Sequence, residues 1–303
     1  MIDAVQSGVK QSITLNCYAK INLTLDVEHP REDGLHPLRS IMQTVELHDS
    51  LHIDRQVDRG MRFSVSGPES KGIPMDSTNL VVKAISLMDQ TFDLDIARNG
   101  ISVELTKNIP SQAGLGGGSS NAAATLLAIC RLFAIPAKVA ELTTLARTLG
   151  SDVPFFLTGG TALVEGTGEA CHQIKTAFAP YPVLIAKGKY GISTAEAYKA
   201  LDSDPGRKPG SSTSLFLSAL ESTSMPQFHN DFHEIISAIE PDVMRTITLF
   251  GEASTSDDYG PALLSGSGAS VFKIYKERVD AEKDANILRS AGLSVYLTSL
   301  KNA

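Results

Sequence analysis

Several features that would assign this chain to a class at once are missing from its sequence. No apolar run approaches the ~20 residues that a membrane-spanning helix needs, and the segment from Met1 to Ser12 lacks the apolar core of a signal peptide. Tryptophan is absent, and only three cysteines occur in 303 residues: Cys17, Cys130 and Cys171. Their wide spacing indicates neither a disulfide framework nor a zinc cluster. We therefore expect a cytoplasmic protein with no membrane partner, whose cysteines are buried small hydrophobic residues.

An excess of positive charge is missing too. The formal net charge of −7 argues against a general nucleic-acid surface, which would show a basic patch or stripe. We expect small molecules as partners, and an anionic ligand must then be bound by local features. A hydrophobic content of 42% is that of an ordinary globular core, and 303 residues suffice for two subdomains or one large α/β domain.

The most informative stretch runs from Asn108 to Phe133 and joins a predicted strand to a glycine-rich turn and an apolar helix. Its glycines are Gly114, Gly116, Gly117 and Gly118. Glycine takes positive φ without steric cost and lets a ligand approach the backbone closely. Ser119, Ser120 and Asn121 are typical N-cap residues, and the helix after them offers free amide donors and a positive dipole end. The stretch predicts a cradle for nucleotide phosphates.

The commoner glycine motifs do not fit this stretch. A P-loop needs lysine after its last glycine, but Gly118 is followed by Ser119 and Ser120. A dinucleotide fingerprint that begins at Gly114 would need glycine at Ser119. A nucleophile elbow around Ser119 fails because position 121 is asparagine. A tight turn before a core helix remains the plainer alternative.

A long alternating segment from Ile13 to Val27 predicts a strand with two different faces. Its polar face carries Lys20, Asn22, Thr24 and Asp26. Taken alone, Lys20 is most simply a solvated strand lysine. Its neighbour Asn22 favours the alternative, a polar face that is turned toward a cleft.

Three other polar residues have both a plain and a functional interpretation. His36 lies in a predicted loop from Glu28 to Pro37. A lone histidine is usually structural or simply exposed, which is the plain interpretation. The functional interpretation is that this loop binds a ligand. Asp152 directly precedes an apolar segment, so it is either a helix cap or a catalytic carboxylate at a helix N-terminus. Asn79 has the position of a cap for the next helix.

Hydrophobic periodicity predicts the remaining elements. We expect further strands at residues 40–47, 50–53, 62–66, 101–105, 161–165, 183–186, 271–275 and 294–297. Helices are expected at 79–92, 136–149, 193–201, 214–220, 232–239 and 279–290. Residues 202–212 have the composition of a surface loop, and 262–270 form a second glycine-serine turn. A boundary near Ala179 divides the chain into an N-terminal domain, 1–179, and a C-terminal domain, 180–303.

Four short motifs occur in an informative order from Ala19 to the final strand. They are Ala19-Lys20-Ile21-Asn22, the run from Gly114 to Ala123, the run from Gly150 to Phe155, and the run from Ser265 to Ala269. In this order they resemble the GHMP kinase superfamily, most closely its members that act on 4-diphosphocytidyl-2-C-methyl-D-erythritol. Several motifs in sequence are far more specific than any one of them.

The resemblance implies an α+β fold with two domains, an N-terminal nucleotide-binding α/β domain and a C-terminal ferredoxin-like domain. It implies ATP as phosphoryl donor, with Mg²⁺, and transfer to the 2-hydroxyl of the substrate, giving the 2-phosphate, in the non-mevalonate isoprenoid route. Asp152 would accept the hydroxyl proton, and Lys20 would keep Asp152 ionised and neutralise developing charge. The protein would be a monomer or weak homodimer.

The resemblance also assigns binding residues. For the nucleotide these are Asn79, Pro110, Gly114, Gly116, Gly117, Gly118, Ser119, Ser120 and Asn121, and for the cytidine diphosphate substrate they are Asn22, His36, Thr194, Tyr198, Gly266 and Gly268. No side chain is assigned as a metal ligand. The family usually has an aromatic residue where this chain has Leu35, so we expect cytidine recognition in weakened or altered form.

Other functions are compatible with parts of the pattern. A related kinase for homoserine, mevalonate or a sugar shares the glycine loop but lacks the Asp-Gly-x-His pattern at Asp33 to His36. A diphosphomevalonate decarboxylase is disfavoured for the same reason. A ligand sensor without chemistry is the non-enzymatic alternative, and the presence of both Lys20 and Asp152 argues against it.

Overall fold

The computed structural model describes residues 11–55, 58–175, 180–204, 206–221, 226–254 and 259–303. Most of the segment from Met1 to Ser12, in which no signal peptide is expected, lies outside these residues. The chain forms two compact units. The first contains Met1–Ala19, His48–Ser111 and Gly116–Thr158, and the second contains Lys20–Leu47, Gln112–Leu115 and Gly159–Ala303.

The units interleave along the sequence because two long strands contribute to both. These are β1 (Ser12–Val27) and β2 (Leu38–Arg55). The predicted domains, 1–179 and 180–303, are instead consecutive. Residues 176–179 lie outside the described residues, and the predicted boundary there stays a prediction. The two strands expected at 40–47 and 50–53 are one, because the polar residues around His48 continue the strand rather than turn it.

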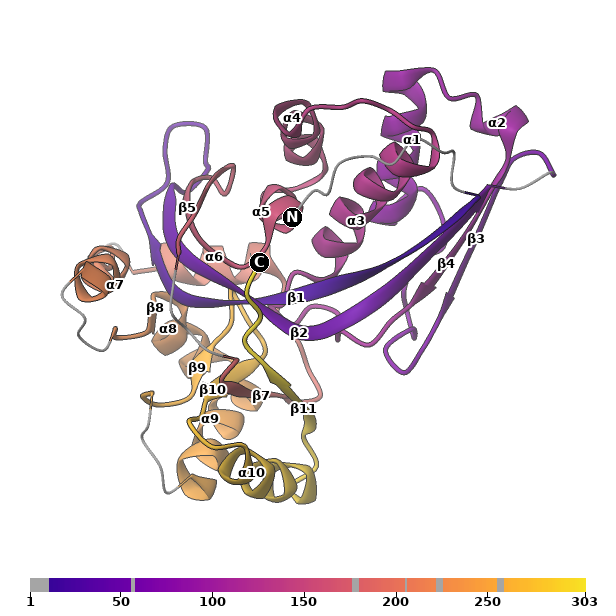
Figure 1. Ribbon diagram of the computed structural model, residues 1–303. Coiled ribbons are helices and arrows are strands. Elements are labelled where there is room, and N and C mark those ends of the chain that lie inside the picture. The colour runs from indigo at the N-terminus through magenta and orange to yellow at the C-terminus, as the bar shows by residue number, and fades with distance from the viewer. Residues whose placement is uncertain (1–10, 56–57, 176–179, 205, 222–225, 255–258) are drawn as a thin grey trace. The chain divides into compact units, whose positions relative to one another are not determined.

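In the first unit, helices pack on the ends of β1 and β2 and on two further strands (Figure 1). β4 (Ile101–Thr106) pairs antiparallel with β2 and parallel with β3 (Met61–Ser66). The helices are α1 (Leu80–Phe92), α2 (Ile96–Asn99), α3 (Gly117–Leu132), α4 (Val139–Leu149) and α5 (Val153–Thr158). α3 packs against α1, α4 and α5, so its apolar surface is buried around most of its circumference.

The second unit contains two sets of paired strands. In one, β1 pairs parallel with β8 (His229–Asn230), β2 pairs antiparallel with β5 (Thr161–Gly166), and β5 pairs antiparallel with β6 (Ala170–Gln173). The other is a sheet in the order β11-β7-β10-β9. Its strands are β7 (Pro182–Lys187), β9 (Leu263–Leu264), β10 (Val271–Ile274) and β11 (Ser294–Ser299).

Helices cover this second sheet. α9 (Pro241–Ala253) and α10 (Arg278–Ser290) pack against β7 (Figure 1). The other helices of the unit are α6 (Thr194–Asp202), α7 (Ser212–Glu221) and α8 (Phe232–Ile239). The α+β class predicted from the sequence is confirmed, because strands and helices of both units follow no regular alternation. The short strands β6 and β8 and the helix α9 were not predicted.

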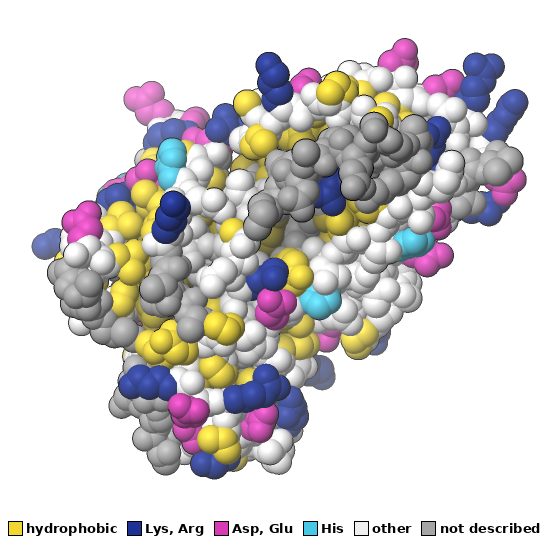
Figure 2. Space-filling view, viewed as in Figure 1, with side chains coloured by type: hydrophobic (Ala, Val, Ile, Leu, Met, Phe, Trp, Pro, Cys, Tyr) yellow, Lys and Arg dark blue, Asp and Glu magenta, His cyan; other side chains and the backbone are white. Residues whose placement is uncertain are grey.

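Cys17 is buried, as expected, whereas Cys130 and Cys171 are only half-buried. Burial raises the pKa of the Cys130 thiol to about 11, so it is an inert thiol at neutral pH. On the face shown in Figure 2, Lys and Arg side chains are interspersed with Asp and Glu. No helix in the described ranges is both long and apolar enough to cross a membrane.

Candidate active site

The glycine loop leads directly into α3, but the helix begins earlier than predicted. Its N-cap is Gly116, with φ +68°, and its first residue is Gly117. Ser119 and Ser120 therefore lie inside the first turn, and Asn121 follows them, so their prediction as N-caps was wrong. The physical reason is that the glycines themselves complete the turn, which a residue with a Cβ rarely does at positive φ. The amides at the start of α3 have no intrahelical acceptor and are free to bind an anion.

The glycines of the loop meet different neighbours. A Cβ on Gly118 would lie 3.4 Å from Leu80 Cδ1, an ordinary contact, so this position has room. A Cβ on Gly117 would lie 3.0 Å from Ile109 Cγ2, and one on Gly114 would overlap the carbonyl oxygen of Ser265. Gly114 is thus required by packing against another turn of the protein, a reason that the sequence did not reveal.

A buried ion pair supports the residues that lead into the loop. The carboxylate of Asp49, on β2, pairs with Lys107 and also accepts hydrogen bonds from the amides of Asn108 (2.7 Å) and Ile109 (2.8 Å). Both charged side chains are almost completely buried. Sequence reasoning missed this pair because its members are far apart along the chain and neither belongs to a motif.

Three other residues of the first unit that were predicted to bind the nucleotide are buried or form few contacts. Asn79 caps α1, accepting from the amide of Val81 at 2.9 Å, as its plain interpretation predicted. Pro110 is buried directly before the loop. Asn121 is also buried, and its Oδ1 has no hydrogen-bond partner among the described residues. A buried acceptor without a partner is costly, so it marks a position where a ligand, ion or water would be stabilised.

Asp152 lies immediately before α5 and is half-buried. Lys20 belongs to the second unit, so the pairing of Lys20 with Asp152 remains a prediction.

Lys20 lies on a polar face of β1 that is buried throughout. Its Nζ donates to Asn22 Oδ1 at 2.7 Å, and Asn22 Nδ2 donates to Ser40 Oγ at 2.8 Å. Ser40 in turn donates to the carbonyl of Thr24 at 2.6 Å. Lys20 is only 3% exposed, so the interpretation as a solvated strand lysine was wrong. These hydrogen bonds fix the direction of the Lys20 side chain.

The second glycine turn lies against Lys20 and against the start of the glycine loop. A Cβ on Gly266 would be 3.1 Å from Lys20 Nζ and 3.1 Å from the carbonyl oxygen of Gly114. Ser265 Oγ donates to that same carbonyl at 3.1 Å. The buried Asn230 donates to the carbonyls of Leu264 and Gly266, each at 2.8 Å. Three segments that are far apart in the sequence are therefore brought together beside Lys20.

Thr194 and Gly268, two other residues predicted to bind substrate, lie near the same turn. Thr194 Oγ1 is 3.4 Å from Ser267 Oγ. A Cβ on Gly268, which has φ +106°, would lie 3.2 Å from the side chain of Ile192. The conformation and the close neighbour both restrict this position to glycine.

The residues that were predicted to bind the cytidine form a separate cluster in the second unit. The ring centroids of His36 and Tyr198 are 4.7 Å apart, and Tyr198 also packs edge-on against Phe232. His36 Nε2 lies 2.8 Å from Asp202 Oδ1. Leu35, at the position that departs from the family, is 51% exposed. The predicted pair of His36 and Tyr198 is thus in direct contact, while Asp202 was not anticipated.

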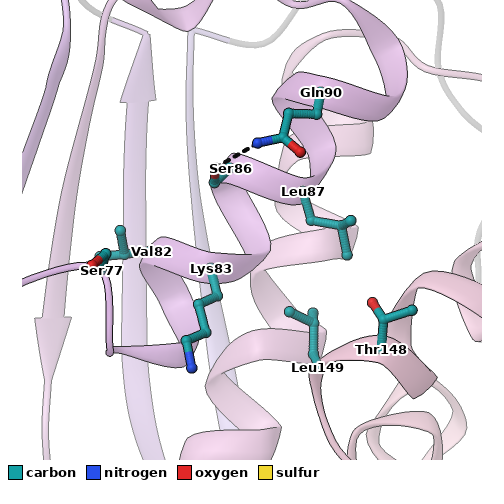
Figure 3. Close-up of a pocket in the computed structure, with 8 residues that line it drawn as sticks. All are labelled: Ser77, Val82, Lys83, Ser86, Leu87, Gln90, Thr148 and Leu149. Carbon is teal, nitrogen blue, oxygen red and sulfur yellow. Dashed lines mark hydrogen bonds between the residues drawn. The ribbon is translucent and has the colours of Figure 1, made fainter.

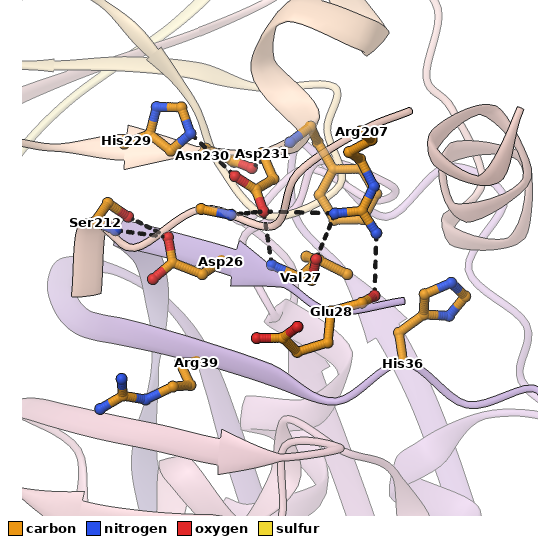
Figure 4. A network of polar contacts seen from close by, with 12 residues as sticks. Asp26, Val27, Glu28, His36, Arg39, Arg207, Ser212, His229, Asn230 and Asp231 are labelled. Carbon is orange, nitrogen blue, oxygen red and sulfur yellow. Dashed lines mark hydrogen bonds and ion pairs between the residues drawn. The ribbon is translucent and has the colours of Figure 1, made fainter. Parts of the chain in front are cut away.

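A polar network attaches residues 207–213 to the end of β1 (Figure 4). Asp26 accepts from the amide of Ser212 at 3.0 Å and from that of Thr213 at 2.8 Å, which caps α7 from another element. Asp231 accepts from the amide of Val27 at 2.8 Å. Arg207 donates to the carbonyls of Val27 and Glu28. Because Asp26 supplies the cap, α7 begins at Ser212, where a loop was predicted.

A cavity of about 350 Å³ lies elsewhere in the first unit, between α1 and the end of α4 (Figure 3). Its lining includes Ser77, Lys83, Ser86, Thr148 and Leu149. None of the residues predicted to bind nucleotide or substrate lines it.

Comparison with known proteins matches residues 79–160 to the N-terminal domain of the GHMP kinases. A 4-diphosphocytidyl-2-C-methyl-D-erythritol kinase of Caldicellulosiruptor saccharolyticus is 35% identical over 94% of this chain and 96% of its own. One from Clostridium botulinum (strain Eklund 17B / Type B) is 34% identical over 94% of this chain and 99% of its own.

Solved structures agree with these relatives. A crystal structure of 4-(cytidine 5'-diphospho)-2C-methyl-D-erythritol kinase aligns with a TM-score of 0.78 and 30% identity, and covers 96% of this chain and 100% of its own. A mevalonate kinase from L. major shares the fold, with 14% identity and a TM-score of 0.74 over 97% of this chain and 98% of its own. This chain belongs to the 4-diphosphocytidyl-2-C-methyl-D-erythritol kinase family of GHMP kinases.

Proposed function

We propose that this chain transfers the γ-phosphoryl group of ATP to the 2-hydroxyl of 4-diphosphocytidyl-2-C-methyl-D-erythritol, giving the 2-phosphate and ADP. The observation that carries the proposal is the buried polar face of β1, where Asn22 directs Lys20 beside the second glycine turn. A lysine that is 3% exposed costs free energy unless its charge is used or compensated. The fixed direction of this buried side chain, beside the second glycine turn, supports a role in the reaction.

In the proposed reaction, the bond between Pγ and the β,γ-bridging oxygen breaks, and a bond from the 2-hydroxyl oxygen to Pγ forms. Asp152 accepts the proton that the hydroxyl loses. The ammonium of Lys20 stabilises the charge that develops on the transferring oxygens. Because phosphoryl transfer proceeds through a loose transition state in most analyses, we expect positioning by these side chains to contribute alongside proton transfer.

The amides at the start of α3 would bind the phosphates of ATP, with the hydroxyls of Ser119 and Ser120 beside them. No group of three metal-ligating side chains occurs in the described ranges, so a Mg²⁺ ion would depend on the nucleotide for most of its ligands. This fits its usual coordination by phosphates, waters and one or two protein oxygens. Among the described residues, the unpartnered Oδ1 of Asn121 is one oxygen that would be available to it. Bound Mg²⁺ would neutralise charge on the phosphates.

At the other end of the substrate, His36, Leu35 and Tyr198 would bind the cytosine. Neither the main-chain N–H nor the C=O of His36 has a hydrogen-bond partner among the described residues. Both are therefore available to a nucleobase edge. A base that stacks on Tyr198 has to share that ring with His36, whose centroid lies 4.7 Å away.

The experiment that tests this function is turnover of a substrate panel by the purified protein with ATP and Mg²⁺. We expect ADP release with 4-diphosphocytidyl-2-C-methyl-D-erythritol and little with mevalonate or homoserine. Preference for mevalonate or homoserine would favour another GHMP kinase, and tight ligand binding without turnover would favour a sensor.

The roles of the two charged residues have their own test. Asp152→Asn keeps the shape of the side chain and removes its charge, so kcat should fall about 10²- to 10⁴-fold while ATP binding changes little. Lys20→Met should also lower kcat. If the two residues act together, the double variant will lose far less than the product of the two single effects. Near-normal turnover of Asp152→Asn would remove it from the reaction.

A further inference from the structure

We propose that Asp202 is a positioning residue for cytidine binding, because it fixes the ring of His36 in one orientation and one protonation pattern. The inference rests on the proposed function, since it assumes that His36 contacts the cytosine. Asp202 is the last residue of α6 and lies one helical turn after Tyr198, so the two side chains share a face of that helix.

The contacts around the His36 ring restrain it from two directions. Its Nε2 is 2.8 Å from Asp202 Oδ1, and its face lies against Tyr198 with a centroid distance of 4.7 Å. The His36 side chain is only 7% exposed, whereas that of Asp202 is 38% exposed. A ring that is covered on one face and bonded at one nitrogen has little freedom to rotate.

The chemistry of the partner also sets where the proton lies. An ionised carboxylate only accepts hydrogen bonds, so the proton in this contact belongs to His36 Nε2. The other nitrogen, Nδ1, has no partner among the described residues. Asp202 therefore determines which ring nitrogen faces a ligand. An asparagine at 202 could either donate or accept, and would leave both tautomers open.

The location of Asp202 argues for a specific role. A carboxylate at the C-terminal end of a helix faces the negative end of the helix dipole, where acidic residues are disfavoured. The hydrogen bond to His36 offsets this cost. The loop from Glu28 to Pro37 is closed by its own backbone hydrogen bond, from the amide of Glu28 to the carbonyl of Pro37 at 2.8 Å. The contact with Asp202 connects that closed loop to α6.

The test compares Asp202→Asn with a matched control, Asp204→Asn. Asp204 is also acidic and close in sequence, but its side chain accepts from the amide of Gly206 at 3.0 Å, a bond that asparagine can keep. For Asp202→Asn we expect the KM of the cytidine substrate and the Kd of cytidine 5'-diphosphate to rise about three- to tenfold, the effect of one hydrogen bond, with kcat unchanged. Asp204→Asn should leave all three unchanged.

A double-variant cycle with His36→Ala separates positioning from a general effect on the fold. If Asp202 acts through His36, cytidine 5'-diphosphate will bind to His36→Ala/Asp202→Asn as it does to His36→Ala alone. Additive losses, or an unchanged Kd in Asp202→Asn while His36→Ala binds weakly, would overturn this inference and leave the proposed function standing. If His36→Ala itself binds cytidine 5'-diphosphate normally, the cytidine site is elsewhere and both ideas fail.

Discussion

Replacing Asp49 with asparagine should destabilise the first unit strongly and weaken ATP binding with it. The carboxylate of Asp49 is fully buried and compensates the ammonium of Lys107, which is 4% exposed. An asparagine at this position can still accept from the amides of Asn108 and Ile109, but it removes the negative charge. Breaking a buried ion pair at one partner costs about 3 to 5 kcal/mol, because the other charge is left uncompensated in a medium of low polarity.

The consequence for function follows from where the pair lies. Asn108 and Ile109 directly precede Pro110 and the glycine loop, and a Cβ on Gly117 would lie 3.2 Å from Lys107 Nζ. Lys107 therefore lies beside the first residue of α3, and a displaced Lys107 side chain would disturb the start of that helix. We expect Asp49→Asn to raise the Kd of ATP as well as to lower the free energy of unfolding.

Urea unfolding and calorimetric ATP titration of the same preparations measure the two effects. Asp54→Asn is the matched control, since Asp54 lies on the same strand in a half-exposed pair with His52, and such a pair contributes at most about 1 kcal/mol. Asp49→Asn/Lys107→Met should recover much of the lost stability, because an apolar side chain needs no charged partner. If Asp49→Asn lowers the free energy of unfolding by less than about 1 kcal/mol, or if the double variant recovers none of the loss, the ion pair does not stabilise the residues that lead into the glycine loop.

Three further predictions concern the loop, the cytidine site and the Asp231 network. Gly118→Val should weaken ATP binding at least about tenfold, or 1.4 kcal/mol. The free energy of unfolding should stay unchanged, because a Cβ at this position meets only Leu80 within the protein. An unchanged ATP affinity by calorimetry would mean that the phosphates bind elsewhere. Leu35→Tyr should lower the KM of the cytidine substrate severalfold and Tyr198→Ala should raise it, both with little change in kcat. The reason is that stacking of a base on an aromatic side chain contributes about 1 to 3 kcal/mol. The opposite pattern in substrate titrations would exclude these residues from the base site. The hydrogen bond to Asp231 raises the pKa of His229. The stability lost in His229→Gln should therefore be largest below about pH 6.5 and should vanish as pH rises through the higher pKa of the folded state. Urea unfolding at several pH values checks this, and a loss that grows with pH would contradict it.

The elements with clear periodicity could be predicted from the sequence, because local hydrophobic spacing reflects which face of an element is buried. β1, α1, α8 and α10 lie within a few residues of their predicted bounds. Most of the elements missed are short and carry little pattern of their own; α9, which buries Val243, Thr246 and Phe250 at helical spacing, is an exception. The two-residue strand β8 exists only because it pairs with the C-terminal end of β1, and α7 begins early only because Asp26 caps it.

The family and the motif residues were determined by the sequence alone, because each motif is a short run of neighbouring residues with a recognisable order. The partners of those residues were decided only by the tertiary structure. Gly114 had been assigned to nucleotide binding, yet it is also required by packing against Ser265. Lys20 had been assigned a catalytic role only through the family resemblance, and the structure adds that its side chain is buried. Asp49 and Asp202 were not anticipated at all. Each of these contacts joins residues far apart in the chain, and a buried charge or a close backbone approach depends on packing that no local pattern records.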